Sequence, residues 1–424
     1  MLGQNARRPL SWWLSAAAVI AISTSCAMWK EVGAVGVALH SNGFDFAGAD
    51  FAGTTWHAIR GLLAGQDVYT TSTRIAGVGV TWPAGEHVPA TLTWQAPFAA
   101  LPLWAGFFAF DITSIAAVWA AVFILTRPRS PQAVLVAACC GSFAILGGAG
   151  LWTLLTGQPP GFELLGIAVL VRARKPWVAA VGFVLAASNF QTGVPLAIAL
   201  IVLQAWPVVW RGTVLTTALS LPPVALGVRA AGGVMPYARV FVRGALGHLA
   251  TLPGEPRGLA DHPSRVDLGG LLYRAGIEST GLQMAAGLLA LVLCLVFLAR
   301  LPTGLRRLDD PPILCLVVGA TILCAYHQPY DMLLVAGAVI PVVLLVADRS
   351  GLMLGVFAVA GIGVAMSING PVAAIVDPVC LIVMTVLSAL AARQAERPAA
   401  ANSPDPTGSA LISTNGTVSG ELAS

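Results

Sequence analysis

The sequence predicts an all-α membrane protein, a polytopic transmembrane helical bundle of about twelve spans with two large extracytoplasmic loops. The chain has 424 residues, of which 57% are hydrophobic and 10% are charged, whereas about 25% of the residues in a soluble domain are charged. Apolar segments long enough to span a bilayer recur along the chain, and basic residues fall in alternate loops between them. These observations exclude a soluble globular protein.

The predicted spans are helices, because a segment in hydrocarbon must pair its backbone polar groups internally. Two of them are short, and the region 177–209 also fits a single broken helix. In chain order the predicted spans are 10–29, 103–126, 131–150, 160–172, 177–189, 192–209, 213–231, 281–299, 311–326, 331–347, 351–368 and 376–392.

The basic residues orient the bundle. With the N-terminus in the cytoplasm, the short inner loops carry most of the Arg and Lys, whereas the short outer loops near 151–159, 327–330 and 369–375 carry none. This pattern follows the positive-inside rule and predicts a multi-pass protein of the cell membrane with both termini cytoplasmic. The long segments 30–102 and 229–280 then form the two outer loops.

Residues 1–392 are predicted to form the membrane domain, and residues 393–424 a disordered cytoplasmic tail. The tail is rich in Ala, Ser, Pro, Thr and Gly and has no apolar periodicity, which is typical of disordered segments. A signal peptide over residues 1–28 is a weaker interpretation, because the charge alternation works best with the first span retained.

The first outer loop holds the candidates for a catalytic base. A carboxylate at the outer membrane surface is placed to take a proton from an acceptor hydroxyl, and Asp50 is the first candidate, followed by Asp45. A helix is expected over 54–64, lying on the outer leaflet with Trp56 on its apolar side and His57 elsewhere. In the alternative interpretation, Asp50 only anchors the N-terminus of this helix.

Further candidates lie in the other outer segments. Arg239 and Arg243 belong to an arginine-rich stretch of the second outer loop, and guanidinium groups bind phosphate bidentately; the alternative is a solvated loop that contacts lipid headgroups. His327 and Tyr330 lie in an outer turn at the mouth of the bundle, where polar residues are candidates for substrate contact. Capping of a helix by Asp331 explains the same turn equally well.

Asn189 and Gln191 interrupt an apolar region, which indicates either a ligand site or a helix break. The chain lacks the motifs of ATP-driven transport, nucleotide-sugar chemistry and zinc proteases. Its seven cysteines all lie in apolar runs, so they are interpreted as core residues rather than metal ligands or disulfides. No nucleic-acid partner is expected.

Short motifs follow the first span in a characteristic order: Asp50-Phe51, Trp56-His57-Ala58, Leu63-Ala64-Gly65-Gln66-Asp67-Val68-Tyr69, His87-Val88-Pro89, Pro97-Phe98-Ala99-Ala100-Leu101-Pro102, Gly157-Gln158 and Tyr330-Asp331. This order resembles glycosyltransferase family 87, the polyprenyl-phosphate-sugar-dependent transferases of the GT-C fold. The family differs in carrying Tyr-Pro-Pro in place of His87-Val88-Pro89 and Lys-Pro in place of Asn189-Phe190.

The resemblance implies a GT-C bundle that transfers mannose or arabinofuranose, with inversion, from a polyprenyl phosphate sugar to a glycolipid or glycan outside the membrane. It implies that Asp50 deprotonates the acceptor hydroxyl and that His87 and Gln158 bind substrate. Membrane lipids are the other expected partners. The lipid-linked sugar is a substrate, and no cofactor or metal is expected.

Two other classes of function remain open. One is a transporter or lipid flippase, and the other is a catalytically degenerate relative that acts as a binding subunit. A transporter is expected to place ionisable residues in mid-span along its pathway. This chain places few there and concentrates its polar residues in the outer loops, which favours the enzyme.

Overall fold

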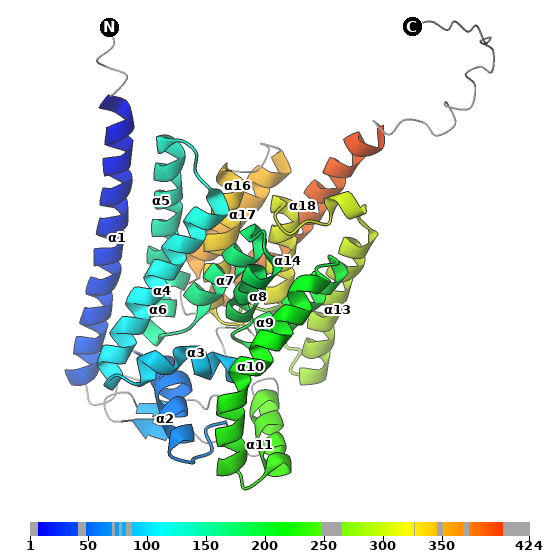
Figure 1. The fold of residues 1–424 in the computed structure, drawn as a ribbon. Helices are drawn as coiled ribbons and strands as arrows, with labels where there is room; N and C mark the ends of the chain where they lie inside the picture. The colour runs from blue at the N-terminus through cyan, green and yellow to red at the C-terminus, as the bar shows by residue number, and fades with distance from the viewer. Residues whose placement is uncertain are drawn as a thin grey trace, which may run out of the picture.

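The computed structural model describes residues 7–40, 48–69, 73–75, 79–81, 87–247, 265–325, 327–345, 351–367 and 373–401. These residues form a helical bundle (Figure 1), which agrees with the predicted all-α class. The one departure among them is a short antiparallel hairpin of β1 (Thr73–Ile75) and β2 (Gly79–Thr81), in which Arg74 pairs with Val80.

The helical elements in chain order are α1 (Arg7–His40), the π-helix η1 (Phe51–His57), α2 (Ala58–Leu63), α3 (Pro89–Ala99), α4 (Leu103–Thr126), α5 (Pro131–Leu146), α6 (Gly148–Thr156), α7 (Pro160–Arg172), α8 (Pro176–Ala186), α9 (Phe190–Val202), α10 (Trp206–Ala230), α11 (Val234–Gly247), α12 (Leu268–Arg274), α13 (Thr280–Arg300), η4 (Thr303–Leu305), α14 (Pro311–Cys324), η5 (Pro329–Asp331), α15 (Met332–Leu334), the π-helix η6 (Val335–Val339), α16 (Ile340–Leu345), α17 (Gly351–Met366) and α18 (Ala373–Ala401).

Five helices of the described chain are long and apolar enough to cross a membrane: α1, α4, α10, α13 and α18. The pair α5–α6, bent by 56°, makes a sixth span if it is counted as one. The remaining apolar helices are shorter than a bilayer-spanning helix, so the number of twelve spans stays a prediction. Several of them, including α8, α9, α14 and α17, are nevertheless predominantly apolar.

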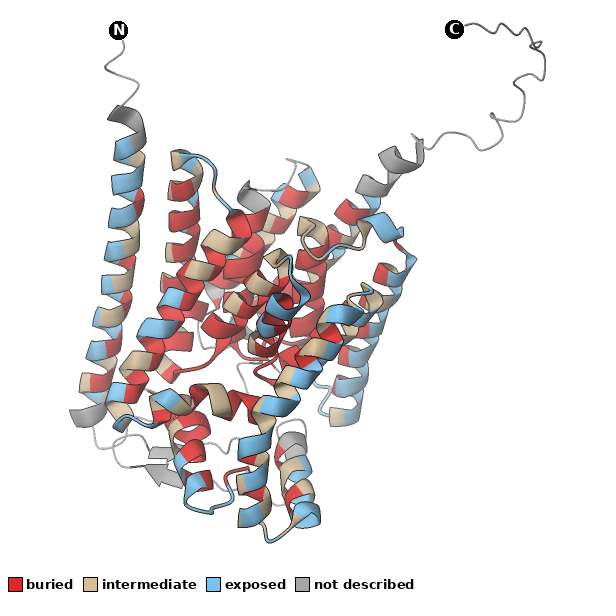
Figure 2. Cartoon of the chain, in the orientation of Figure 1, coloured by how far each residue is buried: buried red, intermediate tan, exposed pale blue. Residues whose placement is uncertain are grey.

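The buried residues concentrate in the middle of the bundle, in α4, α7 and α14, as Figure 2 shows. Helices α1, α10 and α13 lie at its periphery and expose large apolar side chains such as Leu14, Leu221 and Leu288. Exposed apolar side chains on long peripheral helices are expected where a helix faces lipid rather than water.

The two ends of the bundle differ. The start of α1 and the end of α18 lie at one end, here called the terminal end, whereas α2, α3 and α11 lie at the other end, here called the loop end (Figure 1). At the terminal end, Arg127 Nη2 donates to the carbonyl of Arg172 at 3.0 Å, which brings the α4–α5 and α7–α8 turns together. Both turns are basic loops that the charge pattern assigned to one side of the membrane.

Several expected boundaries differ from the structure. Helix α1 continues past the predicted span 10–29 to His40, and the predicted span 131–150 is divided between α5 and α6. The predicted span 192–209 is divided, because Gln204 adopts a left-handed conformation (φ 61°) and Pro207 then starts α10; proline suits the first turn of a helix. In addition, α18 continues to Ala401, so the first residues of the predicted disordered tail are helical.

Candidate active site

The predicted outer loops meet at the loop end. The backbone N–H of Gly48, in the first outer loop, donates to the carbonyl of Leu155 in α6 at 2.7 Å. Thr153, also in α6, donates its hydroxyl to the carbonyl of Tyr330 at 3.3 Å. The N–H of Val266, in the second outer loop, donates to the carbonyl of His327 at 2.9 Å. Segments that are distant in sequence are therefore joined around α6.

Asp50 lies half-buried immediately before η1. Its φ and ψ of −72° and −43° are helical, and its side chain makes no capping hydrogen bond. A capping residue has extended dihedrals and accepts from the first-turn amides, so Asp50 is not a side-chain cap. Its position in the first turn still allows the alternative, in which its charge anchors the start of the helix. The element that follows is a π-helix, a rare conformation that frequently marks functional sites.

Phe51 fixes the start of η1. Its ring is fully buried against Phe107 and Phe110, with centroid separations of 5.9 and 5.4 Å. Gly157 ends α6 with φ 73°, and a Cβ at this position would lie 2.5 Å from the Cβ of Phe51. Two features require glycine at position 157: its left-handed φ and its close approach to Phe51. The two motifs Asp50-Phe51 and Gly157-Gln158 are consequently neighbours.

Gln158 is buried next to this contact. Its side chain is 2% exposed, and its Oε1 has no hydrogen-bond partner in the described parts of the chain. An unpaired buried amide oxygen is costly. Such a group is suited to receive a hydroxyl of a bound ligand.

The expected surface helix is formed by the end of η1 together with α2. Trp56 donates its indole N–H to the carbonyl of Leu101 at 3.0 Å, and the guanidinium of Arg60 lies 4.5 Å from the Trp56 ring centre. These contacts fasten the helix to the α3–α4 turn. His57 is half-buried, and its burial lowers the pKa of the imidazole, which favours the neutral ring.

Helix α3 contributes polar groups that the sequence analysis missed. Thr55 donates its hydroxyl to Oε1 of the fully buried Gln95 at 2.9 Å. Within the described residues, Gln95 Nε2 and the indole N–H of Trp94 are buried without a hydrogen-bond acceptor, and the Trp94 ring lies 5.0 Å from that of Phe162 in α7. A glutamine within the apolar run of α3 was the available signal.

His87 and Asn189 contact each other. His87 is fully buried, and its Nδ1 lies 2.6 Å from Oδ1 of Asn189 at the start of α9. Thr91 strengthens this junction by donating its hydroxyl to the carbonyl of Ser188 at 2.7 Å. Gln191 follows in the first turn of α9, and its buried Oε1 lacks a hydrogen-bond partner among the residues that the structure describes.

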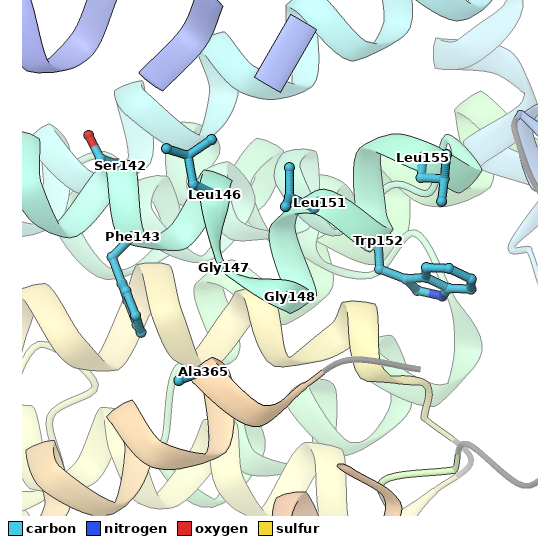
Figure 3. Close-up of a pocket in the computed structure, with 9 residues that line it drawn as sticks. All are labelled: Ser142, Phe143, Leu146, Gly147, Gly148, Leu151, Trp152, Leu155 and Ala365. Atoms are coloured by element: carbon cyan, nitrogen blue, oxygen red, sulfur yellow. The ribbon is translucent and has the colours of Figure 1, made fainter. Parts of the chain in front are cut away.

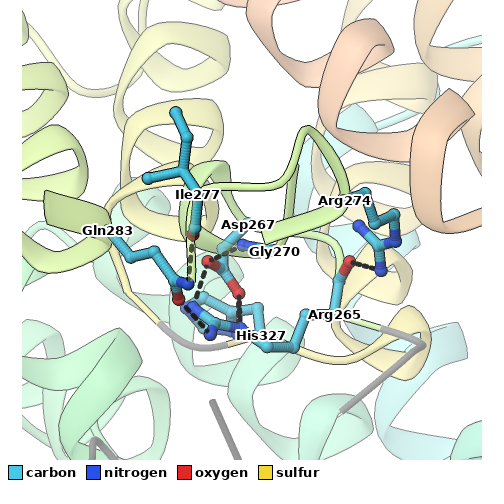
Figure 4. A network of polar contacts seen from close by, with 7 residues as sticks. All are labelled: Arg265, Asp267, Gly270, Arg274, Ile277, Gln283 and His327. Atoms are coloured by element: carbon cyan, nitrogen blue, oxygen red, sulfur yellow. Dashed lines mark hydrogen bonds and ion pairs between the residues drawn. The ribbon is translucent and has the colours of Figure 1, made fainter. Parts of the chain in front are cut away.

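The second outer loop contributes a buried network, which Figure 4 shows. Arg265 donates Nε and Nη2 to the two carboxylate oxygens of Asp267 at 2.9 and 2.7 Å, and Nη1 to Oε1 of Gln283 at 3.0 Å. Asp267 also accepts from the backbone N–H of His327 at 3.2 Å. A bidentate ion pair thereby holds the backbone of the 327–331 turn in place.

His327 is held by a second carboxylate. Its Nδ1 lies 3.0 Å from Oδ2 of Asp331, and both side chains are buried. An ionised carboxylate only accepts hydrogen bonds, so Nδ1 of His327 carries the proton in this contact. Nε2 of His327 is buried and has no hydrogen-bond partner within the described chain. Tyr330 is buried as well and supplies the carbonyl that Thr153 binds.

Among the described arginines of the second loop, Arg239 and Arg243 are exposed on α11, whereas Arg265 is buried. Asp45 lies outside the described residues, and its place relative to Asp50 stays a prediction. No group of three or more His, Cys, Asp or Glu residues that could hold a metal occurs in the part of the chain that the structure describes.

The loop end thus combines a half-buried carboxylate, buried amides beside aromatic rings, and an imidazole oriented by a carboxylate. Amide and indole groups can bind sugar hydroxyls. An imidazole can donate to a phosphate oxygen, and a carboxylate can accept a proton from an alcohol. These groups can therefore bind a hydroxyl-bearing ligand and move a proton.

A model of glycosyltransferase family 87 matches residues 87–325, more than half of the chain. The matched segment contains His87, Gln158, Asn189 and Gln191, whereas Asp50 precedes it. Neither a curated protein nor a solved structure matches the chain.

Proposed function

Because the chain belongs to glycosyltransferase family 87, we propose that it transfers mannose or arabinofuranose from a polyprenyl phosphate sugar to a glycolipid or glycan acceptor. The reaction takes place at the extracytoplasmic surface of the cell membrane, on a bundle of GT-C type whose termini lie in the cytoplasm. Transfer inverts the configuration of the sugar.

The observation that carries this proposal is the position of Asp50. It is half-buried rather than freely solvated, and it lies beside the buried junction of Phe51 and Gly157. That junction belongs to the end of the bundle at which the headgroup of a lipid-linked donor would lie. Phe51, next to Asp50, is fully buried against Phe107 and Phe110, which fixes the backbone beside the carboxylate.

In the proposed step, the carboxylate of Asp50 takes the proton of the acceptor hydroxyl as its oxygen attacks the anomeric carbon. The bond from that carbon to the phosphate oxygen breaks, and its electron pair leaves with polyprenyl phosphate. With a proton on each ring nitrogen, His327 donates from Nδ1 to Asp331 and from Nε2 to the departing phosphate. Trp94, Gln95 and Gln158 bind the sugar hydroxyls through their buried polar atoms.

The test replaces Asp50 by Asn in full-length protein assayed in membranes with radiolabelled polyprenyl phosphate sugars. Asparagine keeps the size but does not take up a proton, so transfer should fall by about 10²- to 10⁴-fold. Asp67→Asn is the matched control, because Asp67 is an exposed aspartate of the same loop, and it should keep full activity. Asp45→Asn tests the second candidate. Full activity of both Asp50→Asn and Asp45→Asn would overturn the proposed base.

A second candidate function is binding of the lipid-linked sugar without transfer. It is favoured by Asn189, which stands where the family carries a lysine and whose amide is occupied by His87 at 2.6 Å. In this case the wild-type protein would retain labelled donor on purification but release no glycosylated product. Product formation by the wild-type protein decides against this alternative.

A further inference from the structure

Two exposed parts of the bundle offer contacts to a molecule from the membrane, and they differ in charge. The groove beside the bend between α5 and α6, which Figure 3 shows, is lined by apolar side chains, glycines and one serine. No charged residue lines this groove, so it has no charge by which to select a lipid. The starts of α8 and α10, at the terminal end, instead carry tryptophan and basic side chains, here called the α8–α10 patch: Arg174, Lys175, Trp177, Trp210 and Arg211.

The aromatic rings fix the position of one cation in the patch. The rings of Trp177 and Trp210 meet edge to face, with their centroids 5.7 Å apart. The guanidinium carbon of Arg211 lies 4.3 Å from the centre of the Trp210 ring and 5.4 Å from that of Trp177. Nη1 of Arg211 also donates to the carbonyl of Pro207 at 2.7 Å. Two cation–π contacts and one hydrogen bond therefore hold the guanidinium between α8 and α10.

The positive charge of the patch is not neutralised within the described part of the chain. There, Arg174, Lys175 and Arg211 form no ion pair with a carboxylate. Arg174 and Lys175 are exposed, whereas Nε of Arg211 is buried and has no hydrogen-bond acceptor among the described residues. A partly dehydrated guanidinium without a counter-ion is stabilised by an anion, and the planar group matches phosphate in particular.

The surface next to the patch is apolar. Val181 follows Trp177 by one turn of α8, and Val214 follows Trp210 by one turn of α10; the two valines are 49% and 50% exposed. Residues four positions apart lie on the same face of a helix, and α8 and α10 pack against each other. A molecule that follows this face thus passes from cations to indole rings and then to hydrocarbon. A phospholipid presents its headgroup, interfacial region and acyl chains in the same order.

We propose that the α8–α10 patch binds an anionic phospholipid of the cytoplasmic leaflet, with Arg211 on the lipid phosphate and the acyl chains along the valine face. The charge pattern of the sequence assigns the terminal end to the cytoplasm, and the cytoplasmic leaflet is the one with a negative surface potential. Arg174 and Lys175 repel the ammonium group of a zwitterionic lipid, which selects an anionic headgroup. The patch lies at the end of the bundle opposite Asp50, so this site is separate from the proposed reaction.

The test measures lipid binding to the purified full-length protein in detergent by native mass spectrometry. The protein is titrated with phosphatidylglycerol and, for comparison, with phosphatidylcholine, which has the same phosphate but carries a cationic choline. The wild-type protein should bind phosphatidylglycerol more tightly. Arg211→Met keeps an unbranched side chain but removes the guanidinium, and it should weaken the tightest binding of phosphatidylglycerol about fivefold or more.

Lys175→Gln changes an exposed position at which folding is not at risk, and it should also weaken this binding. Arg129→Met is the matched control, because Arg129 is an exposed arginine of the α4–α5 turn at the same end, and it should leave the binding unchanged. Equal affinity for the two lipids, or an equal loss in Arg129→Met, would overturn the proposal. Displacement of phosphatidylglycerol by the same concentration of polyprenyl phosphate or inorganic phosphate would also overturn it, by assigning the patch to another phosphate ligand.

Discussion

At the terminal end of the bundle, Arg172 donates Nε to the carbonyl of Leu125 at 3.1 Å, and Arg127 donates to the carbonyl of Arg172. These guanidinium groups satisfy carbonyls at the ends of helices, which have no partner within their own helix. At the loop end, Arg265 is buried and is bound instead to the side chains of Asp267 and Gln283.

The two ends differ in the free-energy cost of losing an arginine. Loss of an arginine from a carbonyl leaves a neutral group without its donor, whereas a buried ion pair that loses one member leaves an unpaired charge. The loop end also keeps polar atoms that no described group satisfies, such as Gln158 Oε1 and His327 Nε2. An end that tolerates such costs is better explained by ligand binding than by stability.

The largest predicted effect breaks the ion pair itself. Arg265→Met leaves the Asp267 carboxylate buried and without its cation, which should destabilise the protein by about 3–5 kcal/mol. Arg172→Met removes the hydrogen bonds to the carbonyl of Leu125 but leaves no unpaired charge, so it should cost less, about 1–3 kcal/mol. Thermal unfolding of both variants in detergent measures the difference, and equal losses would refute the contrast between the two ends.

The next prediction concerns two glycines with nearly the same backbone conformation. Gly157 has φ 73° and Gly65 has φ 76°, but only Gly157 is crowded, by Phe51 and Phe107, whereas nothing lies within 4 Å of a Cβ at Gly65. Gly65→Ala should cost about 1–2 kcal/mol, the penalty of the left-handed region alone. Gly157→Ala should cost clearly more and should reduce transfer, because it displaces Phe51 beside Asp50. Similar unfolding temperatures for the two variants would show that Phe51 moves aside without a cost in stability, which would contradict this prediction.

The sequence predicts the helices of this protein better than their contacts. The predicted spans 103–126 and 160–172 coincide with α4 and α7, because prolines and arginines mark their ends and hydrocarbon length sets their extent. The predicted break between 189 and 192 lies close to the observed turn between α8 and α9. The second break, at the left-handed Gln204, was not predicted, because local sequence carries no signal for it.

The candidate site is predicted less completely. His87 and Asn189 were both chosen, yet their mutual contact depends on how α3 packs against the α8–α9 turn. Arg239 and Arg243 were preferred to Arg265, although Asp267 two residues later is a possible partner visible in the sequence. Tertiary packing decides which arginine is buried, and the number of arginines in a stretch of sequence does not.

A smaller effect compares two glutamines that are equally buried, each 2% exposed. Gln283 is paired on both sides, since Oε1 accepts from Arg265 and Nε2 donates to the carbonyl of Ile277, so Gln283→Leu should destabilise. Gln158 carries an unpaired oxygen, so Gln158→Leu should stabilise the protein by about 1 kcal/mol while it lowers transfer. Thermal unfolding and the transfer assay together check this, and a loss of stability in Gln158→Leu would contradict a ligand role for the oxygen.

The smallest effect is a pH dependence at the loop end. Burial lowers the pKa of His57 below its ordinary value of 6.5, so between the two pKa values the unfolded chain binds more protons than the folded chain. Stability from this group is then complete above pH 6.5 and is lost as the pH falls through the folded-state pKa. His57→Gln cannot take up the proton and should show a flatter fall in unfolding temperature between pH 7.5 and pH 5. A slope unchanged from that of the wild-type protein would assign the acid sensitivity to another group.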